Sequence, residues 1–215
     1  MPKIAVVLSG CGVNDGAEIH EAVITLLALD RAGVEIVCTA PDVAQAHVIN
    51  HVTGEPTGET RNVLVESARI ARGKIKNLAQ LGAGDVDAAI FPGGFGAAKN
   101  LTAWAFQGDA GEVKPEVARF IRDLRAAGKP MGFMCIAPVI AAKVIPGATL
   151  TIGNDRETAA SIEKMGGKHQ ACSVSDIVID RERKLVSTPA YMLATGPAQA
   201  ATGIERLCKA VLELC

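Results

Sequence analysis

The chain has 215 residues, 49% of them apolar and 3% aromatic, and its formal net charge is -1. This length fits one domain over residues 1–215 more readily than two, and aliphatic residues with glycine supply its core. The nearly balanced charge gives no electrostatic reason to expect a nucleic-acid or membrane-surface partner.

The amino-terminal part predicts a strand, a helix and a second strand. The apolar run Ile4–Leu8 predicts the first strand, and Glu35–Thr39 predicts the second. Between them, apolar residues at 3.6-residue spacing predict an amphipathic helix that ends near Gly33. The residues on the apolar stripe of this helix are Ile19, Ala22, Val23, Leu26 and Leu27.

The middle of the chain begins with a polar, glycine-rich segment from about residue 47 to residue 84. We interpret it as an elaboration of the basic fold, with one helix near Asn62–Ile70. A strand at Ala88–Phe91 follows, and Pro115 begins a further helix. The next apolar run predicts a buried strand that ends at Cys135.

The carboxyl-terminal part contains two apolar runs around a polar turn, residues 177–187, which predict a hairpin at the sheet edge. One apolar stripe in the last helix carries Cys208 and Cys215, so both are expected in the core. Repeated strand–helix–strand units imply an α/β fold, with a mostly parallel sheet and helices on both faces. Such sheets bind ligands beyond the carboxyl ends of their strands.

The cysteines, together with the absence of recognisable membrane or export segments, guide the expected compartment. The cysteines are Cys11, Cys38, Cys135, Cys172, Cys208 and Cys215. No pair has the C-x-x-C spacing of a zinc ribbon or a thioredoxin-type redox centre. The sequence shows no signal-peptide pattern and no apolar stretch near the roughly 18 residues of a membrane helix. We therefore expect a cytoplasmic protein with reduced thiols.

Cys135 is the main candidate for chemistry. It ends a strand, and Pro138 lies where a helix would begin. A strand-to-helix turn presents its side chain at the top of the sheet and directs N–H groups and the helix dipole toward it. These surroundings favour the thiolate. The alternative is a small buried hydrophobe, as most free cysteines are.

Two glycine-rich turns also lie at strand ends. The Gly10-Cys11-Gly12 turn is a weak match to a dinucleotide-binding loop, and we favour a tight turn without a cofactor. At Gly93 and Gly94 the backbone N–H groups, with that of Ile136, would form an oxyanion hole. A flexible turn is an equal alternative at this second site.

Possible partners of the thiol are histidines and carboxylates. No histidine adjoins Cys135, and His47 with His51 lacks a third ligand, so no metal site is expected. Glu18 stands three residues after Asp15, in a capping-box arrangement. Glu21 has no capping role; it is either a solvated surface acid or a general acid/base beside the cysteine.

Long strings of the sequence resemble the PfpI superfamily, relatives of class I glutamine amidotransferases, and within it the glyoxalase-like group once linked to isoprenoid biosynthesis. These strings are Leu8–Val13, Glu18–Val23, Val48–His51, Glu59–Leu64, Pro92–Leu101, Gly132–Pro138 and Thr188–Ala194. The resemblance implies a single domain with a flavodoxin-like three-layer sandwich, commonly a homodimer. It implies Cys135 as nucleophile with Glu21 as its acidic partner, and Glu18 as the fallback. The implied activity is glutathione-independent conversion of glyoxal to glycolate, or repair of glycated groups.

The sequence departs from other branches of this superfamily. Ile136 stands where protease-like members have histidine, and Ala137 stands where amidotransferases have glycine, with no downstream His-x-Glu. Glutamine hydrolysis is therefore not expected. The hypothesis is cofactor-free chemistry on a small dicarbonyl or aldehyde. The alternative is a redox-sensing or regulatory protein with incidental aldehyde activity, in which Cys11 serves as a resolving thiol or only packs a turn.

Overall fold

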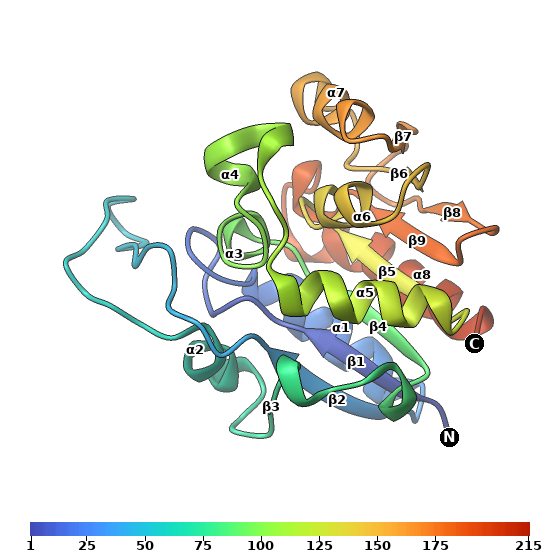
Figure 1. The fold of residues 1–215 in the computed structure, drawn as a ribbon, viewed down its shortest axis with the longest axis horizontal. Helices are drawn as coiled ribbons and strands as arrows, with labels where there is room; N and C mark the ends of the chain where they lie inside the picture. The colour runs from blue at the N-terminus through green and yellow to red at the C-terminus, as the bar shows by residue number, and fades with distance from the viewer.

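A seven-stranded sheet lies at the centre of the computed structural model, which describes residues 1–215 (Figure 1). Its strands in spatial order are β3 (Lys76–Asn77), β2 (Glu35–Ala40), β1 (Lys3–Val7), β4 (Ala88–Phe91), β5 (Met131–Met134), β9 (Leu185–Thr188) and β8 (Val178–Asp180). All neighbours pair in parallel except β8 and β9, which form an antiparallel pair at one edge. The predicted α/β fold and its edge hairpin are confirmed.

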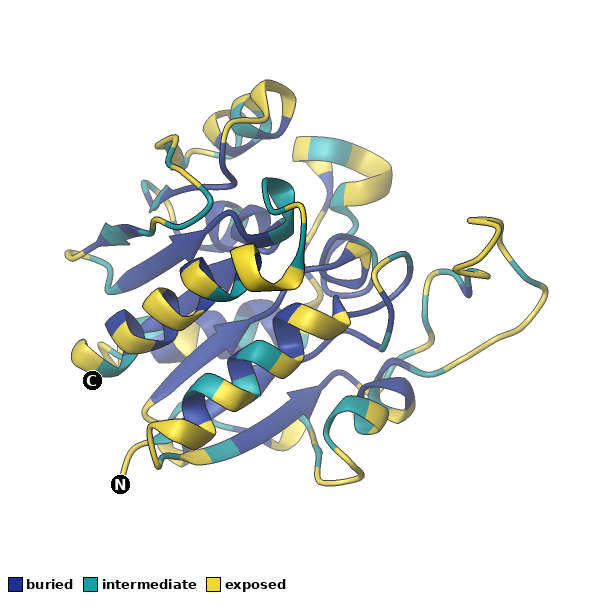
Figure 2. Ribbon diagram, turned by 180° about the vertical axis from the view of Figure 1, so that it is seen from behind, coloured by how far each residue is buried: buried dark blue, intermediate teal, exposed yellow.

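Helices cover both faces of this sheet. They are α1 (Ile19–Arg31), α2 (Val63–Ile70), α3 (Phe95–Lys99), α4 (Trp104–Gln107), α5 (Pro115–Ala126), α6 (Pro138–Val144), α7 (Arg156–Lys164) and α8 (Pro197–Glu213). The longest, α1 and α8, pack on one face, and α5 and α6 pack on the other. Figure 2, seen from the side of α1 and α8, shows exposed residues on the outward sides of these two helices and buried strands beneath them. No helix combines the length and apolar character needed to cross a bilayer.

Alternating side chains of the strands supply two separate cores. In β1, Ala5 and Val7 join the core beneath α5 and α6, whereas Ile4 and Val6 join the core beneath α1 and α8. All of them are fully buried. A strand buried on both faces reads as a continuous apolar run, which is why these strands are visible in the sequence.

Helix α1 differs from its predicted orientation. Ala22 is buried as expected, but Ile19, Val23 and Leu27 are 42%, 48% and 43% exposed. The inner side instead carries Glu21 and, among others, Thr25, whose hydroxyl donates to the Glu21 carbonyl at 2.7 Å. The surface-acid interpretation of Glu21 is therefore wrong. The helix is turned so that polar groups reach the sheet edge.

Smaller differences concern the ends of the chain and its elaborations. Cys208 is 2% exposed, as expected for a core residue, but Cys215 is exposed because α8 ends at Glu213. His169 lies in the short strand β7 (Lys168–His169), which pairs with β6 (Thr149–Leu150) in a separate two-stranded sheet. The segment 41–62 extends from the sheet as an elaboration (Figure 1), followed by α2 close to the predicted bounds.

Candidate functional site

Cys135 occupies a strand-to-helix turn at the carboxyl edge of the sheet. It follows β5 directly and has φ of 57°, a left-handed conformation that is uncommon outside glycine. Its N–H donates to the Thr188 carbonyl at 3.1 Å, and α6 begins three residues later with Pro138. The side chain is only 8% exposed. The predicted elbow is present, and it holds the thiol in a nearly closed position.

Glu21 reaches this thiol from α1. Its side chain is fully buried and lies close enough to the Cys135 thiol for the two groups to affect each other's pKa. One carboxyl oxygen, Oε2, accepts from the Gly93 N–H at 2.8 Å, and the other, Oε1, accepts from the Tyr191 N–H at 3.1 Å. Backbone after β4 and β9 therefore fixes the carboxyl group against the nucleophile candidate.

Close packing around the turn after β4 leaves no room for a side chain at Gly93 or Gly94. A Cβ on Gly93 would lie 2.4 Å from the Cys135 Cβ and 2.8 Å from Glu21 Oε2. A Cβ on Gly94, where φ is 91°, would lie 2.4 Å from the Glu18 nitrogen. The turn is held by hydrogen bonds, such as that from the Phe95 N–H to the Val13 carbonyl at 2.7 Å. The turn is thus part of the site rather than a loose connection.

Burial dominates the electrostatics of the Cys135–Glu21 pair. It raises the pKa of Glu21 from 4.5 to about 7, and the Glu18 charge acts in the same direction. Burial and the Glu21 carboxylate raise the pKa of Cys135 well above 9.0, against the opposing hydrogen bonds from the Gly94 and Ile136 N–H groups. The expected preference for thiolate is therefore wrong for the resting site, because desolvation outweighs the N–H donors.

Glu18 has a different role from Glu21. It is the N-cap of α1, and its Oε2 accepts from the Glu21 N–H at 2.7 Å. Asp15 does not cap this helix as the sequence pattern suggested; its Oδ2 accepts from the Ile49 N–H at 2.7 Å and fixes the elaboration. Glu18 nevertheless lines the same cavity as Cys135, so both predicted acids are at the site.

Tyr191 and His20 belong to the site but were not singled out from the sequence. The Tyr191 hydroxyl and His20 Nδ1 are 2.7 Å apart, and Tyr191 lines the cavity beside Cys135. Ala190, just before it, has φ of 43°, a second strained residue at this edge. Tyr191 is the only tyrosine in the chain and follows a strand, which is the signal that would have indicated it.

A cavity of about 390 Å³ lies over Cys135. Its apolar lining is Val13, Phe95, Trp104, Ile136 and Met192, and its polar side chains are Glu18, Asp155, Thr158 and Tyr191. No cluster of three metal-ligating side chains occurs in the chain. His51 lies in a turn, with Nε2 accepting from the Asn14 N–H at 3.2 Å, and Cys11 does not line this cavity.

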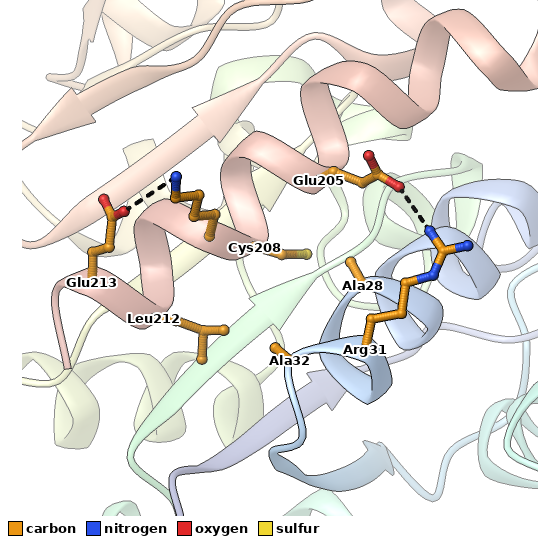
Figure 3. A pocket seen from close by; sticks show the side chains of 8 residues that line it. Ala28, Arg31, Ala32, Glu205, Cys208, Leu212 and Glu213 are labelled. Carbon is orange, nitrogen blue, oxygen red and sulfur yellow. Dashed lines mark hydrogen bonds and ion pairs between the residues drawn. The ribbon is translucent and has the colours of Figure 1, made fainter.

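A second hollow, of about 480 Å³, lies between α1 and α8 (Figure 3). Its charged side chains pair with each other, as Arg31 does with Glu205 at 3.4 Å. Its only thiol, Cys208, has a pKa raised to about 12 by burial and is unsuited to nucleophilic chemistry. The cavity over Cys135 is therefore the candidate functional site.

No protein-family model matches the chain, but relatives are found by sequence and by structure. It is 51% identical to the mitochondrial ES1 protein homolog of Rattus norvegicus, over 99% of this chain and 84% of that protein. It is 50% identical to the mitochondrial glutamine amidotransferase-like class 1 domain-containing protein 3 of Homo sapiens, over 99% and 83%. The mitochondrial ES1 protein of Danio rerio is 34% identical, over 90% and 78%.

Among solved structures, an isoprenoid biosynthesis protein with an amidotransferase-like domain from Ehrlichia chaffeensis superposes with a TM-score of 0.92 and 36% identity, over 99% of this chain and 100% of that one. The DJ-1 superfamily protein STM1931 of Salmonella typhimurium shares the fold, with a TM-score of 0.62. It is 20% identical, and the match covers 99% of this chain and 91% of that one.

The comparisons correct one prediction. The three curated relatives are all named mitochondrial, which contradicts the expected cytoplasmic location. That expectation rested on the absence of a recognisable export signal, and such an absence does not identify a compartment.

Proposed function

Because the chain belongs to the ES1 family of class 1 glutamine amidotransferase-like proteins, which have the DJ-1/PfpI fold, we propose that it converts glyoxal to glycolate through Cys135. The observation that carries the proposal is the Glu21 carboxyl group, fully buried against the Cys135 thiol at the base of a cavity. A carboxyl group with a pKa of about 7 is suited to move protons near neutral pH.

The first step adds the Cys135 S–H across one carbonyl of the substrate. Glu21 takes the thiol proton as the S–C bond forms, which overcomes the raised pKa of the thiol. The carbonyl oxygen gains that proton to give a hemithioacetal. The Gly94 and Ile136 N–H groups, which face the sulfur, stabilise the negative charge that passes through this region.

The following steps move hydrogen between the two carbons. Glu21 removes the proton from the thiol-bearing carbon to give an enediol, and the neighbouring carbon is then protonated. The product is a thioester of glycolate on Cys135. Water cleaves the C–S bond, releasing glycolate and restoring the thiol. The net reaction adds one water to glyoxal and involves no external oxidant or reductant.

The test is glycolate formation from glyoxal by the purified protein beside Cys135→Ser. We expect saturable turnover by the wild type and loss of nearly all of it in the variant, because the hydroxyl is a far weaker nucleophile at its free pKa. Equal rates for the two proteins, or no turnover by the wild type, would rule the proposal out. Cys208→Ser is the matched control, since that thiol is on α8 and does not line the cavity over Cys135.

A further inference from the structure

The cavity over Cys135 is much larger than glyoxal requires. It holds about 390 Å³. The four heavy atoms of glyoxal occupy roughly 120 Å³ if each takes the ~30 Å³ share of a liquid water molecule. On the same basis the ten heavy atoms of phenylglyoxal occupy roughly 300 Å³. The cavity therefore has room for a ring-sized substituent beside the dicarbonyl group.

Two aromatic side chains, Trp104 and Phe95, form part of the cavity wall. Trp104 of α4 lines the cavity, and its indole N–H donates to the Ser161 hydroxyl of α7 at 2.8 Å. This bond ties the ring to a second helix and limits its rotation. Phe95 lines the same cavity and is 50% exposed, so its ring is also available for contact with a ligand. Aromatic rings of this kind recognise flat apolar groups.

The charges around the cavity disfavour an anionic ligand. Glu18 and Asp155 line it, and no lysine, arginine or histidine does. A hydrogen bond from Thr158 lowers the pKa of Asp155, which keeps that carboxylate charged at neutral pH. The ammonium group of Lys99, near Phe95, donates to the Asn14 carbonyl at 3.0 Å. A carboxylate or phosphate on the substrate would thus meet like charge from Glu18 and Asp155, with no basic side chain in the cavity lining.

From the volume of the cavity, its aromatic wall and its acidic lining, we propose that the site binds an uncharged α-oxoaldehyde with an apolar, ring-sized substituent. Trp104 is then a specificity-determining residue. The inference rests on the proposed function and names its substrate class. The chemistry is unchanged: phenylglyoxal and one water give mandelate and a proton. The negative charge of that product, formed beside Glu18 and Asp155, favours its release.

Binding can be measured without turnover, using Cys135→Ser and three inert probes. Mandelamide carries a ring and no charge, mandelate is its anionic counterpart, and glycolamide lacks the ring. Trp104 is the only tryptophan, so its emission reports on this cavity. We expect mandelamide to bind several-fold to about tenfold more tightly than glycolamide, and more tightly than mandelate. Similar affinity for glycolamide, tighter binding of mandelate, or no binding of mandelamide would each overturn the inference.

The residue assignment is tested by calorimetry with Trp104→Ala in the Cys135→Ser background. Mandelamide affinity should fall to near that of glycolamide. Phe106→Ala is the control, because Phe106 is on the same helix and packs against His47 rather than lining this cavity. If Trp104→Ala does not fold, Phe95→Ala tests the same wall. Mandelamide binding unaffected by loss of either ring would overturn the assignment.

This design separates the two proposals. If the wild type turns over neither glyoxal nor phenylglyoxal but the protein still binds mandelamide selectively, the proposed reaction is refuted. The proposed ligand class is then still supported. If the wild type turns over both aldehydes with equal kcat/KM, the proposed reaction is supported and the proposed ligand class is refuted.

Discussion

The Glu21 carboxyl group lies between two backbone N–H donors and the Cys135 thiol, with no exposure to solvent. Burial without water disfavours the charged carboxylate relative to the neutral acid, and this raises the pKa of Glu21. The resulting pKa of about 7 has consequences for rate and for stability that can be measured separately.

The first consequence is a pH-dependent rate. Glu21 acts as a base above its pKa, so kcat/KM for glyoxal should rise with pH through about 7. Glu21→Gln should lower kcat/KM by about 10² to 10⁴ and remove this rise. Glu18→Gln should lower kcat/KM less and should keep its rise with pH, because Glu18 caps α1 rather than contacting the thiol. A larger loss in Glu18→Gln would show that the two acids have been assigned in the wrong order.

The second consequence is a pH-dependent stability. The folded-state pKa of Glu21 is raised above the unfolded value of 4.5, so the folded state binds more protons between pH 4.5 and about 7. The wild type therefore loses unfolding free energy as pH rises through this window, by about 3 kcal/mol at 1.36 kcal/mol per pKa unit. Glu21→Gln lacks this loss. Urea unfolding of both proteins at pH 4.5 and pH 8 would show it; a constant difference between them would contradict it.

At the scale of the elements, the strand positions are readable from sequence and the helix orientations are not. Strands such as β4, buried on both faces, appear as apolar runs bounded by turn residues. Helix α1 has an apolar stripe, but the side of the helix that faces the sheet is the one that carries Glu21 and Thr25. These two residues interact with residues far away in sequence. Periodicity alone cannot report such contacts.

The site shows the same division. Cys135 follows β5 directly and Gly93 lies two residues after β4, so both are predictable at the carboxyl edge of the sheet. Trp104 is not, because α4 spans only Trp104–Gln107 and such a short helix has no periodic pattern. His20 reaches the site through Tyr191, a contact across 171 positions of sequence.

The outward stripe of α1 also concerns assembly. Ile19, Val23 and Leu27 lie one helical turn apart and are each more than 40% exposed. We expect this surface to contact a second copy in the homodimer that the family resemblance implies, because exposed apolar surface of this kind marks interaction sites. Val23→Asp should shift the protein toward monomer in sedimentation velocity, while changing unfolding free energy by about 0.5 kcal/mol or less.

A control for this prediction is available on the neighbouring helix. Val65 of α2 is 61% exposed and outside the stripe, so Val65→Asp should leave the oligomeric state unchanged. A monomeric wild type at micromolar concentration, or equal effects of the two substitutions, would exclude the stripe as the dimer surface.

At the scale of the whole molecule, the cysteines differ in their suitability for redox sensing. A sensor thiol needs low pKa and exposure. Burial raises the pKa of both Cys135 and Cys215, but Cys135 is 8% exposed whereas Cys215 is exposed. The Cys135 thiol, at the carboxyl edge of the sheet, is thus shielded by the same burial that raises the pKa of Glu21. This environment favours catalysis on a bound substrate over reaction with peroxide in solution.

We therefore expect Cys135 to be oxidised by hydrogen peroxide at pH 8 no faster than Cys215, as measured by differential alkylation and mass spectrometry. The Glu21 charge raises the pKa of Cys135, so Glu21→Gln should increase the thiolate fraction and speed alkylation of Cys135 by iodoacetamide. Slower alkylation in Glu21→Gln would instead mean that a protonated Glu21 stabilises the thiolate in the wild type. Combined with preferential peroxide oxidation of Cys135, that result would favour the sensor over the enzyme, because the thiol would then be reactive without a substrate to activate it.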